Sequence, residues 1–160
     1  MKRSSLSLIL ILTAALALFP ACGEKKIPEQ VGERSKSVLT VLQEMTAAYE
    51  AKDIKAFMAN VAGSYQGREG LEKALGGVFA KYATINFTIH YAKMIILIEH
   101  RGLIKPTFTW DAEWISSDGS AMKDGGRITL GFEPNDFKLK TIDGRNPFLA
   151  QPTEAPAGKQ

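Results

Sequence analysis

The sequence predicts an α+β domain in which three N-terminal helices pack on a mainly antiparallel sheet. Two observations predict it. Apolar residues recur at three- and four-residue spacing up to Tyr82, and after Tyr82 they alternate with polar residues. The composition agrees, because 45% of the 160 residues are hydrophobic and 23% are charged, which is typical of a globular protein. The length favours a single domain, which we expect over residues 34–150.

The helical part contains three apolar stripes. The first comprises Val38, Val41, Leu42, Met45, Ala48 and Tyr49. Asp53 is expected to cap a second, short helix that stops before Gly63, because an aspartate side chain accepts hydrogen bonds from the free amides of a first turn. The third stripe runs from Leu71 to Tyr82 and is interrupted by Gly76-Gly77. These glycines predict close packing or a kink. A phosphate loop is not expected, because no strand precedes them.

A period of two begins at Thr84 and predicts the strands. The apolar positions are Ile85, Phe87, Ile89 and Tyr91, then Phe108, Trp110, Ala112 and Trp114, then Ile128, Leu130 and Phe132, and finally Phe137 and Leu139. Such alternation is typical of antiparallel strands with one buried and one wetter face. A continuous apolar run spans Met94 to Ile98, and turns are expected over 116–126 and 134–136.

Residues 1–21 are typical of an export signal. A positively charged start precedes an apolar run from Leu6 to Phe19, which is shorter than the roughly 20 residues of a spanning helix. The only cysteine, Cys22, follows at once. This junction resembles the lipobox of bacterial lipoproteins: Ala21 matches the pattern, whereas Phe19 and Pro20 depart from it.

The lipobox resemblance implies that Cys22 is lipidated and becomes the mature N-terminus. The alternative is an ordinary signal peptide with a chance cysteine. Residues 22–33 are then a lipidated cysteine and a flexible tether, and residues 151–160 are a disordered tail. Gly23 stands where an aspartate retains some lipoproteins at the inner membrane, which favours the outer membrane and a domain that faces the periplasm.

The charge balance excludes a nucleic-acid-binding protein. Of the 20 Lys and Arg residues, Lys2 and Arg3 lie in the expected signal, so the formal net charge falls from +3 to about +1 after its removal. One excess charge makes no stripe that could neutralise a phosphate backbone. We therefore expect no nucleic-acid partner.

Several segments resemble the NTF2-like (SnoaL-like, ketosteroid-isomerase-like) superfamily. Met45–Phe57 is similar to its first helix junction, and Tyr65–Leu71 to the entry of its third helix. Gly126–Phe132 and Phe137–Ile142 resemble its last two strands. The resemblance implies a cone, in which a curved sheet wraps the helices and leaves a pocket at the wide end. The superfamily includes enzymes and pure binding modules, so the fold alone does not determine the function.

The residues that ketosteroid-isomerase chemistry needs are missing. The resemblance places Met45 where those enzymes have a tyrosine, and residues 62–67, where their base lies, contain no carboxylate. The remaining catalytic candidates are Asp111 and Glu113, which share one face of a strand because they are two residues apart. The alternative is a solvated face, with cross-strand cations opposite the carboxylates. The candidate cations are Lys138, Lys140 and Arg127.

Aromatic residues on the opposite face are candidates for an apolar pocket. The pocket-lining candidates are Tyr49, Phe57, Phe87, Tyr91, Met94, Trp110 and Trp114. Simple core packing is the alternative. His90 is expected on the surface of its strand and His100 in a turn, and neither has the spacing of a zinc site. We expect no metal and no cofactor.

These observations favour a periplasm-facing lipoprotein whose non-catalytic domain binds a small apolar ligand or a partner protein. One alternative is an enzyme of the isomerase or hydrolase type that uses Asp111 or Glu113. Another is an envelope assembly module that docks through its sheet face. We expect the lipid anchor to hold the protein at a membrane, and the polar sheet face to leave it a monomer or a weak homodimer.

Overall fold

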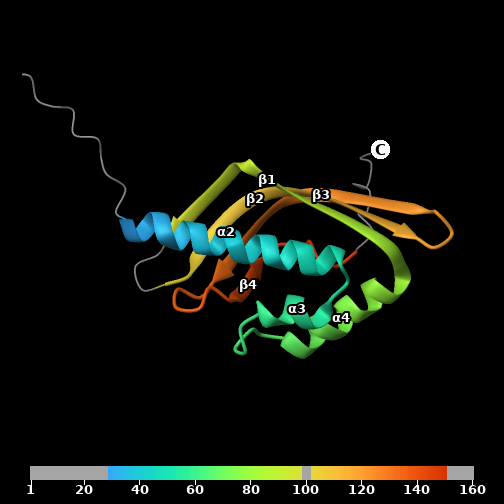
Figure 1. The fold of residues 1–160 in the computed structure, drawn as a ribbon, viewed down its shortest axis with the longest axis horizontal. Coiled ribbons are helices and arrows are strands. Elements are labelled where there is room, and N and C mark those ends of the chain that lie inside the picture. Colours follow the sequence, from blue (N-terminus) through green and yellow to red (C-terminus); the bar gives the residue numbers. More distant parts are fainter. Residues whose placement is uncertain (1–28, 99–101, 151–160) are drawn as a thin grey trace, which may run out of the picture.

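The computed structural model describes residues 29–98 and 102–150, and its elements follow the predicted order (Figure 1). The helices are α2 (Glu29–Glu50), α3 (Ile54–Ala59) and α4 (Arg68–Lys81), and the strands are β1 (Tyr82–Ile98), β2 (Ile104–Ser116), β3 (Ala121–Phe132) and β4 (Leu139–Asp143). The predicted α+β layout of helices followed by an antiparallel sheet is confirmed. Cys22, His100 and the expected tail lie outside the described residues.

The long helix α2 presents one buried face to the sheet. The members of this face are Val38, Leu42, Met45 and Tyr49. The helix begins at Glu29, inside the segment predicted as a tether. Glu33 lies near the start of the helix, where a negative charge suits the positive end of the helix dipole. None of the helices within residues 29–98 and 102–150 has the length and hydropathy to cross a bilayer.

The two shorter helices confirm the predicted cap and show what surrounds the glycine pair. The carboxylate of Asp53 accepts a hydrogen bond from the Ala56 amide at 2.9 Å and so begins α3. The Gly76-Gly77 pair does not interrupt α4. A Cβ added at Gly76 would make an ordinary contact with Cδ1 of Ile54 at 3.6 Å, and one at Gly77 would meet nothing within 4 Å. Close packing therefore does not require either glycine.

The four strands pair antiparallel in the order β1-β2-β3-β4, which makes β1 and β4 the edges. Between the pairs His90–Thr109 and Ile95–Thr107, β1 has residues 91–94 whereas β2 has only one residue. This irregularity bends the strand, and Figure 1 shows the sheet arching over α2. Glu50 of α2 occupies part of the free edge of β1, because its carboxylate accepts a hydrogen bond from the Phe87 amide at 2.8 Å.

Two sequence predictions about strand boundaries are wrong. Residues 121–126 belong to β3 and not to a turn. Gly125 is needed there for close approach, because a Cβ at this position would clash with the Asp111 carboxylate and lie 2.9 Å from the carbonyl oxygen of Trp110. Phe137 precedes β4 with a left-handed backbone (φ 55°). The turn that holds it there is closed by a hydrogen bond from its amide to the Glu133 carbonyl at 3.0 Å.

The two faces of the sheet differ in what covers them. On β2, the even-numbered residues from Ile104 to Trp114 are buried, and the odd-numbered residues between them are half-buried or exposed. The buried side, called the inner face below, packs on the helices. On the opposite side, called the outer face, no helix of the described residues lies (Figure 1). The core therefore lies between the helices and the inner face.

Candidate functional site

Aromatic side chains fill the space between the helices and the inner face. We call them the aromatic cluster: Tyr49 of α2, Phe57 of α3, Phe87 of β1, Trp110 and Trp114 of β2, and Phe148 near the end of the described chain. Each is at most 4% exposed. Centroids of contacting rings are 4.9 to 6.2 Å apart, mostly in tilted, edge-to-face or offset arrangements that aromatic pairs prefer.

A single buried hydrogen bond lies inside this cluster. The indole Nε1 of Trp114 donates to the hydroxyl oxygen of Tyr49 at 2.8 Å, and neither residue has exposed surface. Burial raises the pKa of the Tyr49 hydroxyl well above its ordinary value, and the bond from Trp114 offsets only part of this rise. Tyr49 is therefore neutral at physiological pH, and its role is to satisfy a buried donor and to join α2 to β2.

Phe148 closes the cluster from the C-terminal side. Its ring centroid lies 4.9 Å from that of Phe57, 5.3 Å from that of Tyr49 and 5.3 Å from that of Phe87, on which it stacks. Only 1% of Phe148 is exposed, although it lies on the segment that follows the last strand. This side chain therefore fills the space between the rings of Tyr49, Phe57 and Phe87.

An ion pair holds the segment that carries Phe148. The guanidinium of Arg145 donates to the Asp124 carboxylate at 2.5 Å and lies over the Trp110 ring at 5.9 Å. It also donates to the carbonyl oxygen of Gly125 at 3.3 Å. The Asp124 side chain is only 5% exposed, so solvent screens this pair less than an ordinary surface pair. The closure by Phe148 is thus supported by contacts to β2 and β3.

Five of the predicted pocket-lining residues are buried in the core. The five, which contact one another or Phe148, are Tyr49, Phe57, Phe87, Trp110 and Trp114. Tyr91, in contrast, is 41% exposed on β1. The side chain of Met94 lies outside what the structure describes.

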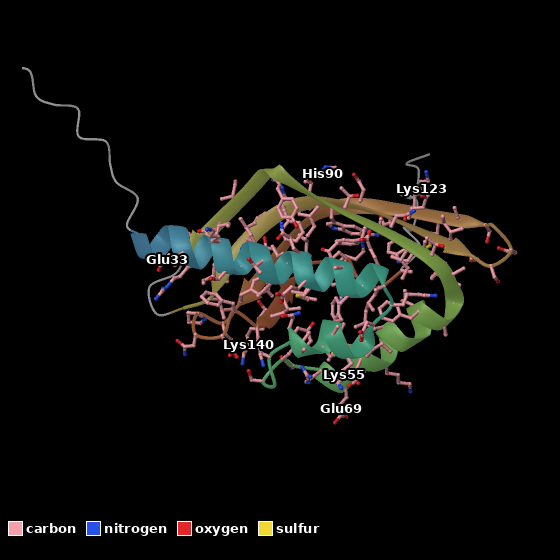
Figure 2. The ribbon with its side chains drawn as sticks, in the orientation of Figure 1. Glu33, Lys55, Glu69, His90, Lys123 and Lys140 are labelled. Atoms are coloured by element: carbon pink, nitrogen blue, oxygen red, sulfur yellow. The ribbon has the colours of Figure 1, made fainter. Side chains whose placement is uncertain are left out.

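Asp111 and Glu113 lie on the outer face. Nε2 of His90 lies 2.5 Å from Oδ2 of Asp111. Glu113 forms an ion pair with Lys123 at 3.0 Å and accepts a hydrogen bond from Asn86 at 3.2 Å. Figure 2 shows His90 and Lys123 on the outer side of the arched sheet. The carboxylates thus face solvent, on the side opposite the aromatic cluster.

The cations expected opposite these carboxylates lie elsewhere. Lys140 of β4 pairs with Glu133 at 3.1 Å, and Lys138 lies in the turn before β4. Arg127 of β3 is opposite Thr109 of β2. The reason for the two lysines is the strand order: among the strands, β4 pairs only with β3, so Lys140 and the preceding Lys138 are one strand away from the carboxylates of β2. The expected charge pairing is found with other partners.

A shallow, open hollow of about 460 Å³ accompanies these residues. It is lined by Asn86, Thr88, Asp111, Ala112, Glu113, Lys123 and Asp124. Gly125 contributes to it, because it leaves the position opposite Asp111 without a side chain. The lining offers both charges and hydrogen-bonding groups. It is therefore suited to polar groups of another molecule.

The electrostatics of this hollow do not favour acid–base catalysis. Hydrogen bonds from Lys123 and Asn86, with the Lys123 charge, hold the pKa of Glu113 below its ordinary range, whereas a general acid at neutral pH needs a raised one. The side chains of His90 and Asp111 are 44% and 67% exposed, so water competes for both. Within residues 29–98 and 102–150, no cluster of three His, Cys, Asp or Glu side chains could hold a metal ion.

A second hollow, of about 340 Å³, lies between α4 and the C-terminal segment. Its lining is Ala74, Gly77, Val78, Lys81, Tyr82, Leu149 and Ala150. Most of its lining residues are apolar in type, and Lys81 is the charged one. Because Leu149 and Ala150 follow Phe148 directly, this hollow borders the segment that closes the core.

Three residues that shape these sites carry faint signals in the sequence. Phe148 is the last aromatic residue, followed by a tail that contains none, which could have indicated a docked C-terminal segment. His90 lies on the same polar side of β1 as Thr88 and Asn86. Its contact with Asp111 depends on the register between β1 and β2, which the sequence does not give. Gly125 resembles a loop glycine until its cross-strand partner is known.

No protein-family model and no curated protein sequence matches the chain. Solved structures do match it. A candidate aromatic ring hydroxylase from Novosphingobium aromaticivorans is 14% identical with a TM-score of 0.59, over 72% of this chain and 91% of that one. An NTF2-like protein of unknown function from Exiguobacterium sp. 255-15 is 15% identical with a TM-score of 0.51, over 64% and 93%.

A candidate calcium/calmodulin-dependent protein kinase II association domain from Xanthomonas campestris is 14% identical with a TM-score of 0.55, over 68% of this chain and 81% of that one. At such identities the likeness is one of fold alone. The chain therefore has an NTF2-like α+β fold, as the sequence resemblance predicted. The names of these structures span an enzyme, an association domain and a protein of unknown function, so the fold leaves the function open.

Replacing Tyr49 by phenylalanine should destabilise the protein. The Y49F variant keeps the ring but leaves Nε1 of Trp114 buried without its acceptor, which typically costs about 1–3 kcal/mol. Urea unfolding followed by tryptophan fluorescence measures the loss. Tyr65→Phe is the control, because Tyr65 is only half-buried and lies outside this bond. Equal stabilities of the two variants would show that the bond does not matter.

Proposed function

We propose that the protein is an envelope-anchored, periplasm-facing lipoprotein whose non-catalytic domain binds a partner protein through the outer face of its sheet. The anchor is the lipid on Cys22 that the lipobox resemblance implies. The observation that carries the choice of partner is the closed core. The space in which a small apolar ligand would bind is filled by the protein's own aromatic cluster, with Phe148 completing it.

The outer face offers a charged surface that a partner protein could bind. It presents a hollow whose lining carries charges of both signs, with Lys123 beside Glu113. His90 and Asp111 extend this pattern along the sheet. Such a surface favours a polar interface, in which a partner's charged groups set register and association rate. Binding should therefore weaken as ionic strength rises, because exposed charges are screened.

A second candidate function is the binding of a small apolar ligand in place of Phe148. The observation in its favour is the largely apolar hollow between α4 and the C-terminal segment. Because Phe148 belongs to a segment that follows the last strand, moving that segment would open the aromatic cluster without unpairing the sheet. A ligand the size of an aromatic ring would then take the place of the Phe148 ring.

An enzyme that uses Asp111 or Glu113 is less well supported. The His90–Asp111 pair is the feature that favours it, because a carboxylate can orient an imidazole for proton transfer. The pair is open to water, however, and Glu113 is held in its ionised form. Neither condition suits a general acid or a buried charge relay.

Replacing Cys22 by serine tests the anchor. The C22S chain should lack acyl groups in its intact mass and move from the membrane fraction to the soluble fraction of fractionated cells. Gly23→Asp is the matched control: it leaves the cysteine in place, so the chain should stay acylated and shift from outer to inner membrane. An unacylated wild-type chain would contradict the proposed anchor.

Site-specific cross-linking in cells tests the partner surface. A photo-reactive residue at Thr88, in the hollow, should form an adduct with a defined protein, and Lys123→Glu in the same chain should weaken that adduct several-fold. The matched controls use Lys55 on α3, which Figure 2 shows on the opposite side of the molecule. A probe at Lys55 should give no such adduct, and Lys55→Glu should leave the Thr88 adduct unchanged. Equal adducts from both positions would refute the assignment of the surface.

Truncating Phe148 separates the two candidates. F148A should lower the free energy of unfolding by about 3–5 kcal/mol, because it leaves a cavity among packed rings. Leu149→Ala, at a half-buried neighbour, should cost less. Added benzene should raise the melting temperature of F148A by filling the cavity, and should leave the wild type unchanged. A comparable rise in the wild type would favour the small-ligand candidate.

A further inference from the structure

The last part of β1 carries two large apolar side chains on the outer face. Ile95 is 67% exposed and Leu97 is 58% exposed, and across the sheet they pair with Thr107 and Lys105. Their neighbours Ile96 and Ile98 point the other way and pack against the core. Period-two alternation would place polar residues at 95 and 97, so the exposed pair is not explained by folding. We call Ile95 and Leu97 the apolar tip.

The apolar tip lies at the end of the molecule from which α2 starts. In Figure 1, the final part of β1 and the first turns of α2 occupy the same end of the longest axis. Figure 2 labels Glu33 of α2 at that end and Lys123 of β3 towards the other. Glu29, the first residue of α2, is seven residues after Cys22. A chain of that length spans at most about 25 Å.

We propose that Ile95 and Leu97 insert into the headgroup region of the membrane that holds the lipid anchor, so that this end of the domain faces the bilayer. The inference rests on the proposed lipidation of Cys22. A tether this short keeps the first turns of α2, and with them the apolar tip, close to the bilayer surface. The charged hollow beside Lys123 then points away from the membrane, where a partner can reach it.

A membrane suits the apolar tip better than a second copy of the chain. A stable protein interface buries on the order of 800 Å² on each partner, far more than two side chains supply. Insertion of two side chains is also weak alone, but the anchor keeps them at a high effective concentration at the surface, so weak insertion suffices. Lys105 of β2 lies opposite Leu97, and a cation beside apolar residues favours an anionic bilayer.

An environment-sensitive dye tests the proposal on the full lipidated chain. Leu97→Cys introduces the probe site, because lipidation consumes the native thiol of Cys22. The matched control is Lys123→Cys on the same outer face, where the side chain is 76% exposed. Both chains are labelled with a nitrobenzoxadiazole dye and reconstituted into phosphatidylethanolamine vesicles that contain a minority of phosphatidylglycerol. We expect a blue shift and quenching by spin-labelled lipid at position 97 and neither effect at position 123.

Three other outcomes would overturn the proposal, and they are distinguishable. In the first, the emission of the dye at 97 shows the same exposure to water as that of the dye at 123, while the intact mass shows acyl groups on Cys22. This result would support the anchor and refute the insertion. If the mass shows no acyl groups, the anchor fails and the insertion fails with it. If the dye at 97 is already shielded in detergent and the chain is a dimer, a second copy covers the tip. Matched melting temperatures of both labelled chains exclude misfolding as the cause.

Discussion

The hydrogen bond from Trp114 to Tyr49 is the contact on which the rest of the core depends. An indole N–H buried among rings must find an acceptor, and the acceptor here comes from α2, the long helix that lies under the arch of the sheet. The bond thereby fixes both the rotation of α2 and its position along β2. The rings of Phe57, Phe87 and Phe148 then pack around the Tyr49 ring, each from a different part of the chain.

This arrangement divides the sheet into a closed side and an open side. The inner face is filled by its own aromatic side chains, so in this chain the NTF2-like cone has no open interior for chemistry among the rings just named. The outer face carries the charged residues, including His90 and Asp111, within reach of solvent. The proposed partner binding therefore rests on the outer face, which the packed core holds in position.

The sequence was sufficient where a structure depends on local periodicity. The buried face of α2, the cap at Asp53 and the inward aromatic residues of β2 all follow from spacing. It was insufficient where a contact depends on register or on tertiary closure. Alternation places Asp111 and Glu113 on one face but cannot choose their partners, because that choice requires the strand order. Phe148 lies beyond the last periodic segment, so no pattern marks it as core.

The place of Phe148 in the chain also determines when the aromatic cluster can be completed. Only the last few residues of the described chain follow it, yet its ring contacts partners from α2, α3 and β1. During synthesis the earlier elements emerge first, and their aromatic side chains must wait for residue 148 before the interior is complete. A nascent chain of this protein therefore lacks the ring that joins these three elements until residue 148 has emerged.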